Sequence, residues 1–579
     1  MIFQKLFLIL VSLLLSLLFP FSAKAIYDPR SVPNNRFGIH IINDSDLEDA
    51  KNLVNSSGGD WGYVKFVIEE DDRDTSKWQE VFDKMREKHL IPVVRIATQP
   101  QGDVWLKPSV EDARDWAEFL DSLNWVVENR YVVIFNEPNH AKEWGGIVNP
   151  EEYTLTLRAF RDALKERDEN FFVLNAGLDA SAPNTPDTMD EEDFLEAMHQ
   201  ADKNIFDDLD GFSSHSYPNP GFSGDALDTG KGSVATYIWE MLFLRNLGVV
   251  NDLPIFITET GWSNINLEED EIAENFVSAY DLVWNNYNVV AVIPFVLNYQ
   301  NPPFTEFSWI TGEEGDEGRF SSWYKAVQDF PKVQGVPRQI LTAEAVNNLP
   351  PKLVESSVHQ FNLEFTNTGQ AIWDTNDDYK IEIVTDGPII EFANSPLYVK
   401  PGERLFLPTI LKTPQVEGEY EVEIVLSGKG TNKVTLLKQK IALVSPLKLN
   451  FTAKSLVLKN TEGNDFELTV LDGKSQIVYF ANVAVRDGVG NIPEIHNLIP
   501  GKQYSFKLSN KHYISKTANG SLDVGNNTIR FGLIIPYDFN ANGIPDLVDY
   551  AQTVAISYRT ASNWLKDLTG VNIVKFLTP

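Results

Sequence analysis

The chain has 579 residues, too many for a single hydrophobic core, and its length predicts three or four domains. Hydrophobic residues make up 43% of it and charged residues 23%, which is typical of folded protein and argues against wholesale disorder. The formal net charge of −33 argues against nucleic acid and anionic membrane surfaces as partners, because both need clustered Lys and Arg. The absence of cysteine excludes disulfides, thiolate metal sites and a cysteine nucleophile.

Residues 1–25 have the pattern of a secretory signal peptide. Lys5 supplies the positive charge, an apolar core runs from Leu6 to Ser22, and Ala23-Lys24-Ala25 fits the small-x-small cleavage pattern. An uncleaved membrane anchor is the alternative, but the apolar core is short and the cleavage site is present. We therefore expect a secreted or cell-surface protein with no membrane contact after signal cleavage.

From residue 26 to 335, short apolar runs alternate with amphipathic segments. Eight strands and eight helices over about 300 residues predict an α/β fold, a (β/α)8 TIM barrel. An open doubly wound sheet is the alternative, but no glycine-rich phosphate loop follows the first strand. The expected strands are Phe37–Ile42, Tyr63–Ile68, Ile91–Ala97, Val132–Phe135, Phe171–Gly177, Leu209–Ser214, Pro254–Glu259 and Val289–Leu297. The expected helices are Asp46–Val54, Lys77–Lys88, Val110–Glu128, Glu151–Arg167, Glu191–Ala201, Val234–Leu247, Glu269–Trp284 and Ser321–Gln328.

After residue 335 the hydrophobic pattern changes to period two, which indicates all-β structure. Residues 336–445 predict an immunoglobulin-like β-sandwich, with Phe361–Phe365 and Tyr420–Ile424 as clear alternating runs. Residues 446–536 predict a second sandwich, in which Phe466–Val470 alternates in the same way. A spacer function is the expectation for both.

The tail, residues 537–579, contains a candidate calcium loop followed by helical sequence. Oxygen-bearing side chains occupy positions 1, 3, 5, 9 and 12 of a loop with Gly543 at position 6, which is the spacing of an EF-hand. The predicted ligands of a structural Ca²⁺ are Asp538, Asn540, Asn542, Asp546 and Asp549. The loop resembles half of a dockerin, but residues 558–570 offer no second set of ligands, which argues against docking to a cohesin.

Two predicted strands each deliver one glutamate to the same edge of the barrel. The fourth ends in Asn136-Glu137-Pro138 and the seventh in Glu259. Each glutamate alone could be a helix cap or a solvated loop acid. His215 and Tyr217 end the sixth strand, beside the seventh, where a Tyr hydroxyl can hold a carboxylate ionised. Two carboxylates at one edge are the minimum for cleaving a glycosidic bond.

With these motifs, residues 30–330 resemble the clan A glycoside hydrolases, nearest to the cellulase-like family 5 or family 39. The resemblance implies that Glu137 is the acid/base, that Glu259 is the nucleophile and that Asn136 binds the sugar 2-hydroxyl. The clan often carries a tryptophan at the end of the eighth strand, where this chain has Phe295-Val-Leu-Asn-Tyr299; Tyr299 or Trp309 is the expected substitute. The other expected substrate-binding residues are His215, Tyr217, Arg95 and Trp262.

The implied function is a secreted, retaining glycoside hydrolase that cleaves β-glycosidic bonds of a polysaccharide or oligosaccharide by double displacement, without a catalytic cofactor. For this chemistry we expect the two carboxyl groups about 5–5.5 Å apart, with Glu137 protonated and Glu259 ionised. A non-catalytic carbohydrate-binding or adhesive protein on a degenerate barrel remains an alternative. A transglycosylase is another, because transfer differs from hydrolysis only in the access of water.

Overall fold

A computed structural model describes residues 26–312, 319–392, 396–428, 433–455, 465–510, 513–534, 546–552, 554–555 and 559. The chain divides into two compact units, Met1–Leu341 with Gly369–Ile372, and Thr342–Thr368 with Trp373–Pro579. The predicted signal peptide lies outside the described residues. Across the part of the chain that the structure describes, no helix has the length and apolar character needed to span a bilayer.

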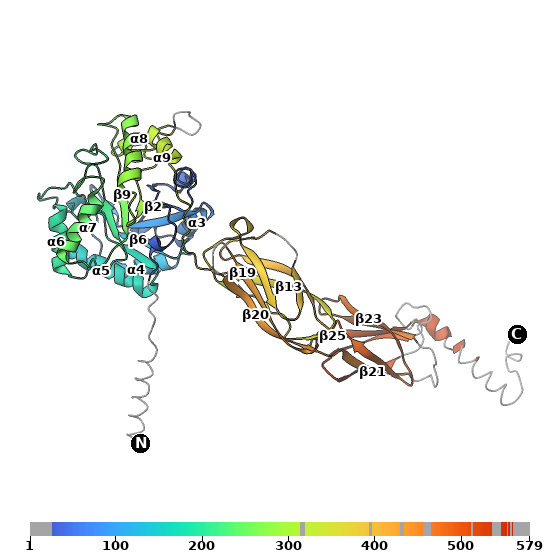
Figure 1. The fold of residues 1–579 in the computed structure, drawn as a ribbon. Coiled ribbons are helices and arrows are strands. Elements are labelled where there is room, and N and C mark those ends of the chain that lie inside the picture. Colours follow the sequence, from blue (N-terminus) through green and yellow to red (C-terminus); the bar gives the residue numbers. More distant parts are fainter. Residues whose placement is uncertain are drawn as a thin grey trace, which may run out of the picture. The chain divides into compact units, whose positions relative to one another are not determined.

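Parallel strands form the centre of the first unit, with helices around them (Figure 1). Five pair in the order β1-β2-β3-β6-β7 and three in the order β10-β9-β8. Parallel bridges from Leu174 to Gly211 and from Phe37 to Val292 join the two sheets at both edges, so the strands close into a ring. The strands are β1 (Gly38–His40), β2 (Gly62–Glu69), β3 (Leu90–Ala97), β6 (Arg130–Ile134), β7 (Phe171–Leu174), β8 (Phe212–His215), β9 (Ile255–Glu259) and β10 (Val289–Val292), with a short hairpin β4 (Pro100–Gln101) and β5 (Val104–Trp105).

A helix follows each of these parallel strands, at the places that the sequence predicts. The helices are α2 (Leu47–Val54), α3 (Thr75–Glu87), α4 (Asp112–Asp121), α5 (Pro150–Arg167), α6 (Glu191–Ala201), α7 (Thr236–Leu247), α8 (Glu269–Ser278) and α9 (Ser322–Asp329). Shorter turns are η1 (Pro29–Ser31), η2 (Asp44–Asp46), η3 (Glu70–Asp72), η4 (Ala141–Glu143), η5 (Ala279–Val283) and η6 (Thr305–Phe307).

Two predicted helices end earlier than expected. α4 stops at Asp121 rather than Glu128, where the Ser122 hydroxyl donates to the carbonyl of Phe119 and competes with the helical ladder. α8 ends at Ser278 and continues as the π-helical turn η5, which places Trp284 in the core. Burial of Trp284 thus decides where the chain leaves α8, and local hydrogen bonding at Ser122 decides where it leaves α4.

Aromatic side chains fill the ring beneath its carboxyl end. Tyr131 lies 6.0 Å from Tyr63 and 5.2 Å from Phe256 between ring centroids, and Phe172 lies 5.5 Å from Phe256. All four are buried. Because side chains alternate along a strand, Lys65 shares the inward face of β2 with Tyr63 and lies one layer nearer the carboxyl end. The aromatic layer therefore forms a rigid floor for polar groups above it.

The second unit consists of β-sheets in which most strand pairs are antiparallel. In one part the sheets β11-β13-β18-β16 and β12-β20-β19-β15 enclose a core that includes Trp373, and in the other β24-β21-β27 and β23-β22-β25-β26 enclose a core that includes Phe451. β18 alternates exposed and buried residues, as the period-two pattern predicts. The elements are β11 (Ala343–Ala345), β12 (Lys352–Val354), β13 (Val358–Asn367), β14 (Trp373–Asp374), η7 (Thr375–Asp377), β15 (Lys380–Thr385), β16 (Ile389–Phe392), β17 (Tyr398–Val399), β18 (Arg404–Lys412), β19 (Gly418–Ser427), β20 (Lys433–Val444), β21 (Leu447–Ser455), β22 (Asp465–Leu471), β23 (Ile477–Ala484), β24 (Val489–Ile495), β25 (Gln503–Asn510), β26 (Tyr513–Ser521) and β27 (Asn526–Ile534).

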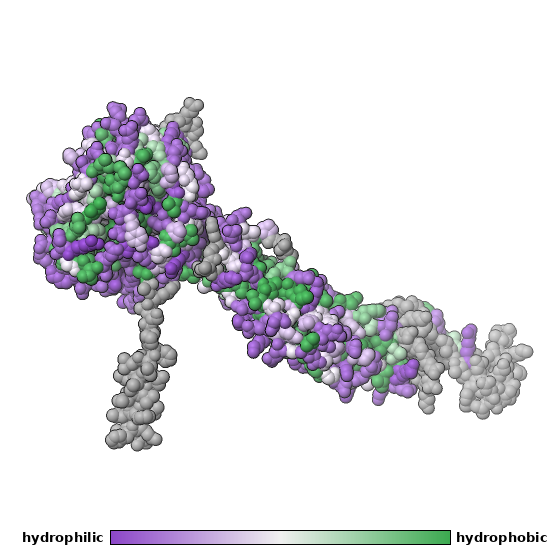
Figure 2. All heavy atoms as spheres, viewed as in Figure 1, coloured by the Kyte–Doolittle hydropathy of each residue, from purple (hydrophilic) through white to green (hydrophobic). Residues whose placement is uncertain are grey.

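The surface of the chain is largely hydrophilic on the face that Figure 2 shows, in keeping with 82 Asp and Glu residues. Of the predicted calcium ligands, Asp538, Asn540 and Asn542 lie outside the described residues. Asp546 and Asp549 cap a helical segment that begins at Leu547: the Asp546 N–H donates to Asp549 Oδ2 (3.0 Å), and the Val548 N–H donates to Asp546 Oδ1 (2.8 Å). This reciprocal cap stabilises the start of the segment.

Candidate active site

Glu137 lies on a sharp turn at the carboxyl end of β6. The strand is buried up to Ile134, and Phe135 and Glu137 then take positive φ angles of 68° and 32°. Such angles are costly for residues other than glycine and persist only where the surroundings fix them. The Glu137 N–H donates to the carbonyl of Gly177 (3.1 Å), which anchors the turn to the segment after β7. The turn holds the Glu137 carboxyl at the rim of the ring.

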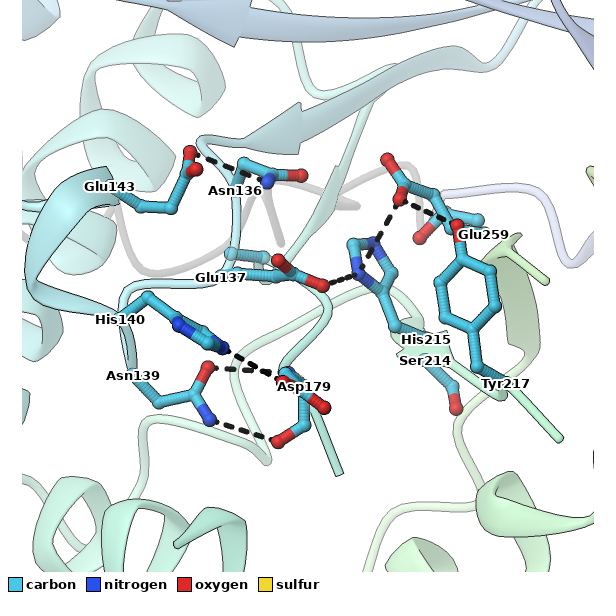
Figure 3. Close-up of polar contacts among 12 residues, drawn as sticks. Asn136, Glu137, Asn139, His140, Glu143, Asp179, Ser214, His215, Tyr217 and Glu259 are labelled. Carbon is cyan, nitrogen blue, oxygen red and sulfur yellow. Dashed lines mark hydrogen bonds and ion pairs between the residues drawn. The ribbon is translucent and has the colours of Figure 1, made fainter. Parts of the chain in front are cut away.

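Glu259 is the last residue of β9, and its carboxylate has three partners, of which Tyr217 and His215 are labelled in Figure 3. Lys65 Nζ lies 2.8 Å from Oε1, and the Tyr217 hydroxyl donates to Oε2 (3.2 Å). His215 Nδ1 is 3.9 Å from Oε2. The Glu259 side chain is only 12% exposed, so these groups rather than water solvate its charge.

His215 connects the two glutamates. Its Nδ1 lies 2.9 Å from Glu137 Oε1. One imidazole nitrogen of His215, one carboxyl oxygen of Glu137 and one of Glu259 all lie within 4.8 Å of one another. Gly177 makes room for the imidazole, because a Cβ at that position would lie 2.1 Å from His215 Cδ2. The carboxyl groups of Glu137 and Glu259 therefore lie close enough to act on one bound group.

The charges around Glu259 keep it ionised. Burial by itself raises the pKa of this carboxyl, but the Lys65 ammonium, followed by His215, His40 and Arg95, outweighs burial and holds the pKa far below its usual range. Burial and the Glu259 charge raise the pKa of Tyr217 well above its ordinary value, so Tyr217 stays a neutral hydrogen-bond donor. An ionised carboxylate with fixed donors is poised to act as a nucleophile.

Lys65 is a site residue that the sequence reasoning missed. Its side chain is completely buried, and Nζ also donates to the carbonyl of Thr258 (3.2 Å). The sequence does hold a signal for it: a lysine in the middle of the apolar run Tyr63–Ile68, on the same face as the buried Tyr63. A buried lysine requires a charged or hydrogen-bonding partner.

Asn136 and Glu143 form a second polar contact beside Glu137. Asn136 Nδ2 donates to Glu143 Oε2 at 3.4 Å, while Asn136 Oδ1 is buried without a hydrogen-bond partner. Burial raises the pKa of Glu143, an effect that the Arg95 charge partly offsets and the Glu137 charge reinforces. Glu143 was not predicted as a site residue.

A histidine–aspartate pair flanks Glu137 on the side of β7. His140 Nε2 lies 2.8 Å from Asp179 Oδ2, and the His140 N–H donates to the carbonyl of Glu137 (2.9 Å). Burial opposes the charge of each group, but the His140–Asp179 hydrogen bond outweighs it: the pKa of His140 is raised and that of Asp179 is lowered to about 2. The pair was missed because His140 and Asp179 lie in irregular segments after β6 and β7, which no periodic pattern marks.

A cavity of about 660 Å³ opens at the carboxyl ends of β1, β2 and β3 and beside the segment after β10. Its volume falls in the range of small-molecule sites, but its lining includes neither Glu137 nor Glu259. Arg95 and Tyr299, both predicted as substrate-binding residues, line it, together with the aromatic rings of Trp105, Phe295 and Phe304. Of the two residues expected to substitute for a tryptophan after the last strand, Tyr299 lines the cavity, and Phe295 lies beside it in the segment after β10.

The prediction that Trp262 stacks on a sugar is wrong. Trp262 is 2% exposed, its Nε1 donates to the carbonyl of Gly224 (2.8 Å), and its ring packs edge-to-face on Phe276 of α8. The chain turns after Glu259 and carries the indole behind β9 into the layer of α8. Trp309 is also buried, 1% exposed and 4.8 Å from the Phe276 ring, so it offers no sugar platform either.

One group of acidic and histidine side chains within the described residues is compact enough to surround a cation, and it consists of Glu137, His215 and Glu259. The Lys65 ammonium already supplies the positive charge at Glu259, and the His215 Nδ1 atom is engaged by Glu137. This arrangement can support acid–base and nucleophilic chemistry without a cation between the carboxylates.

No protein-family model and no curated protein matches the chain. Among solved structures, the chain is similar to a family 39 glycoside hydrolase from Bacteroides cellulosilyticus WH2, at 15% identity over 67% of this chain and 82% of that one (TM-score 0.38). It is also similar to a monomeric β-xylosidase from Caulobacter crescentus CB15, at 12% identity over 66% and 98% (TM-score 0.36), and to a β-mannanase from Thermomonospora fusca, at 15% identity over 52% and 92% (TM-score 0.34). These likenesses are distant, and the functional conclusion rests on the side chains of the site.

Proposed function

We propose that this chain is a retaining β-glycoside hydrolase that acts on a polysaccharide or oligosaccharide, with its first unit a (β/α)8 barrel. The observation that carries the proposal is the pair formed by Glu137, on the turn after β6, and Glu259, at the end of β9, which have carboxyl oxygens within 4.8 Å of each other. Lys65 and Tyr217 fix the second of these carboxylates in its ionised form. Glycoside hydrolysis requires two carboxyl groups in opposite protonation states.

The short separation favours retention of configuration. Inverting enzymes hold their carboxyl groups about 6.5–9.5 Å apart so that a water fits between base and sugar, whereas retaining enzymes hold them about 5–5.5 Å apart. One Glu137 and one Glu259 carboxyl oxygen lie within 4.8 Å of each other, which supports the shorter class. Glu259 then attacks the sugar directly.

In the first step, a Glu259 oxygen attacks the anomeric carbon while Glu137, as a carboxylic acid, gives its proton to the departing glycosidic oxygen. The bond from the anomeric carbon to that oxygen breaks and a glycosyl ester of Glu259 forms. Lys65 and Tyr217 hold the Glu259 carboxylate in place during the attack. Asn136 binds the 2-hydroxyl, a contact that strengthens in the transition state.

In the second step, Glu137 is a carboxylate and takes a proton from water as that water attacks the anomeric carbon. The ester bond to Glu259 breaks, the sugar leaves with its original configuration, and both glutamates return to their starting protonation states. His215 donates from Nδ1 to Glu137 in its ionised form, at 2.9 Å, and so keeps the base aimed at the reacting carbon. A transglycosylase differs only in that a sugar hydroxyl replaces the water.

The buried Lys65 supports catalysis over carbohydrate binding alone. Removing an ammonium from water is costly, and its pairing with an ionised carboxylate at the sugar-binding edge serves a nucleophile. A protein that only binds neutral sugar has no use for such a pair.

The proposal is tested by assaying purified protein on aryl β-glycosides and on β-glucans, mannans and xylans. Glu259→Gln and Glu137→Gln are the test variants, and Glu118→Gln, whose side chain is 70% exposed on α4, is the matched control. We expect wild type and control to cleave a substrate and Glu259→Gln to lose this activity. NMR of the products should show that the β-anomer of the sugar is released first. A wild type inert on every substrate, or an unimpaired Glu259→Gln, would overturn the proposal.

We also propose that the protein is exported after removal of residues 1–25, that the β-sheets of the second unit form two sandwich spacers, and that the tail loop at Asp538 to Asp549 binds Ca²⁺. Amino-terminal sequencing of the exported protein should begin at Ile26. Calcium should raise the melting temperature of the tail region in the full chain. An unprocessed start, or no shift at millimolar calcium, would remove the respective proposal.

A further inference from the structure

Three acidic side chains surround the reacting centre, but the mechanism above uses only two of them. The third, Glu143, ends η4, and its side chain is 11% exposed. The charged groups around it are Arg95 on β3, Glu137 after β6 and Lys142 beside it on η4, whose Nζ is 3.9 Å away. Its hydrogen-bond partner is the side-chain amide of Asn136.

The Asn136 amide has two ends with opposite hydrogen-bonding character. In the structure Nδ2 donates to Glu143 Oε2, the arrangement that suits an ionised Glu143. Oδ1 is then left buried without a donor, a costly state for a carbonyl. Figure 3 shows this free end pointing away from Glu143, toward the side of the site where Glu259 lies. A carbonyl dipole aimed toward carboxylates is electrostatically unfavourable, whereas an N–H is favourable there.

A neutral Glu143 favours the opposite orientation of the Asn136 side-chain amide. Its carboxylic acid O–H can donate to the Asn136 carbonyl, and the amide, which has nearly the same shape after a half-turn, then directs Nδ2 toward the reacting centre. Burial favours this neutral form, since it raises the pKa of Glu143 and the Glu137 charge adds to the effect, with Arg95 and Lys142 opposing. An environment that keeps a carboxylic acid neutral so that it donates a hydrogen bond is a known catalytic device.

We propose that Glu143 is a positioning residue: as a neutral carboxylic acid it donates to the side-chain carbonyl of Asn136 and turns the Asn136 N–H toward the 2-hydroxyl of the sugar. The inference rests on the proposed function. It assigns the substrate as a sugar with an oxygen at C2 that accepts a hydrogen bond. When Glu143 ionises, the amide turns back, as the structure shows it, and Asn136 no longer offers an N–H to the sugar.

The test compares kcat/KM for an aryl β-glycoside with that for its 2-deoxy analogue, as a function of pH. The effect of Glu137 and Glu259 protonation on kcat/KM cancels in this ratio, because both substrates need both groups. In wild type the ratio should be high at low pH and fall about tenfold, the worth of one hydrogen bond, as pH rises through the raised pKa of Glu143. In Glu143→Gln it should stay high at every pH, since the amide group of Gln donates without titrating.

Glu143→Ala and Asn136→Ala should both give a low ratio that does not change with pH, and Glu118→Gln should match wild type. The proposal is overturned if Glu143→Ala keeps the wild-type ratio, or if the wild-type ratio does not depend on pH while Glu143→Gln behaves identically. A purely structural role for Glu143 would lower kcat/KM for both substrates equally and leave the ratio unchanged.

An infrared difference spectrum tests the hydrogen bond without using activity. Wild type minus Glu143→Gln should show a protonated carboxylic acid band that persists to higher pH than for a free glutamate. Absence of that band above the ordinary glutamate pKa rejects the inference even for an active enzyme. Failure of the proposed function would appear separately, as a wild type that cleaves no glycoside.

Discussion

Lys65 Nζ lies 2.8 Å from Glu259 Oε1, and no part of the lysine side chain is exposed. The two residues come from neighbouring layers of the same ring, Lys65 from the middle of β2 and Glu259 from the end of β9. Burial lowers the pKa of Lys65, and the Glu259 charge offsets part of this effect. Each group therefore depends on the other for its charge. The pair therefore sets the ionisation and the position of the nucleophile together.

Replacing Lys65 with Met should lower kcat/KM on the order of 100-fold, comparable to removing one fixed donor from an active site. Without the ammonium, the largest of the charges that oppose burial is gone, and the pKa of Glu259 rises. Because the nucleophile acts only when ionised, the acidic limb of the pH–activity profile should move to higher pH. The profile of kcat/KM against pH measures both effects.

Two controls accompany this variant. Lys65→Arg keeps a cation and should keep the acidic limb nearer to that of wild type than Met does. Lys51→Met removes a lysine whose side chain is 44% exposed on α2 and should change neither rate nor profile. An acidic limb at the same pH in Lys65→Met and wild type would contradict the function that we assign to this pair.

Small anions should distinguish the two glutamates. In Glu137→Ala an activated aryl glycoside still forms the glycosyl ester, and azide should restore turnover by attacking it, giving a β-glycosyl azide. In Glu259→Gly azide should occupy the space of the lost carboxylate and attack the substrate directly, giving the α-azide. NMR of the products distinguishes the two anomers. The same anomer from both variants would contradict the assignment, because azide takes the place of water in the second step when Glu137 is removed and of the nucleophile in the first step when Glu259 is removed.

Trp262→Ala should act mainly on stability. The indole is 2% exposed and packs against Phe276, so its removal leaves a cavity and costs about 3–5 kcal/mol of unfolding free energy. Tyr299→Ala, at the edge of the cavity, should instead raise KM with a small effect on stability. Denaturant unfolding and steady-state kinetics on both variants measure this contrast. A large KM effect of Trp262→Phe at unchanged stability would contradict it.

Glu191 on α6 and Glu240 on α7 form a fully buried carboxyl pair. Burial raises the pKa of Glu240 from 4.5 to about 7, and burial and the Glu240 charge raise that of Glu191 well above its usual value. In the unfolded chain both groups ionise near pH 4.5, so between pH 4.5 and 7 the folded state holds protons that the unfolded state releases. Stability should therefore fall as pH rises through this window.

Glu240→Gln removes the titration of one member of the pair. The melting temperature of this variant should fall less steeply than that of wild type as pH rises from about 5 to 8. The change in Glu240 pKa from 4.5 to about 7 corresponds to about 3 kcal/mol at 1.36 kcal/mol per pH unit. Glu196→Gln on the exposed side of α6 is the control. Parallel melting curves across this pH range for wild type and Glu240→Gln would contradict the assignment.

Strong local patterns in the sequence were enough to place the parallel strands and their helices. Each apolar run of the first unit is long enough to bury one strand, and the period of the pattern separates strand from helix. The ends of α4 and α8 were misplaced because burial of Trp284 and local bonding at Ser122, rather than helical periodicity, decide where the chain leaves the helix. Tertiary packing overrides propensity at element ends.

By itself the sequence determined which residues stand at the strand ends, and so placed Glu137, His215, Tyr217 and Glu259 at one edge. The tertiary structure decided what surrounds them. Lys65 reaches Glu259 across 194 residues of sequence, Glu143 meets Asn136 through a turn with positive φ angles, and Trp262 folds away from the site into the core. These contacts depend on the closure of the ring and on the direction of loops, which no local hydrophobic pattern encodes.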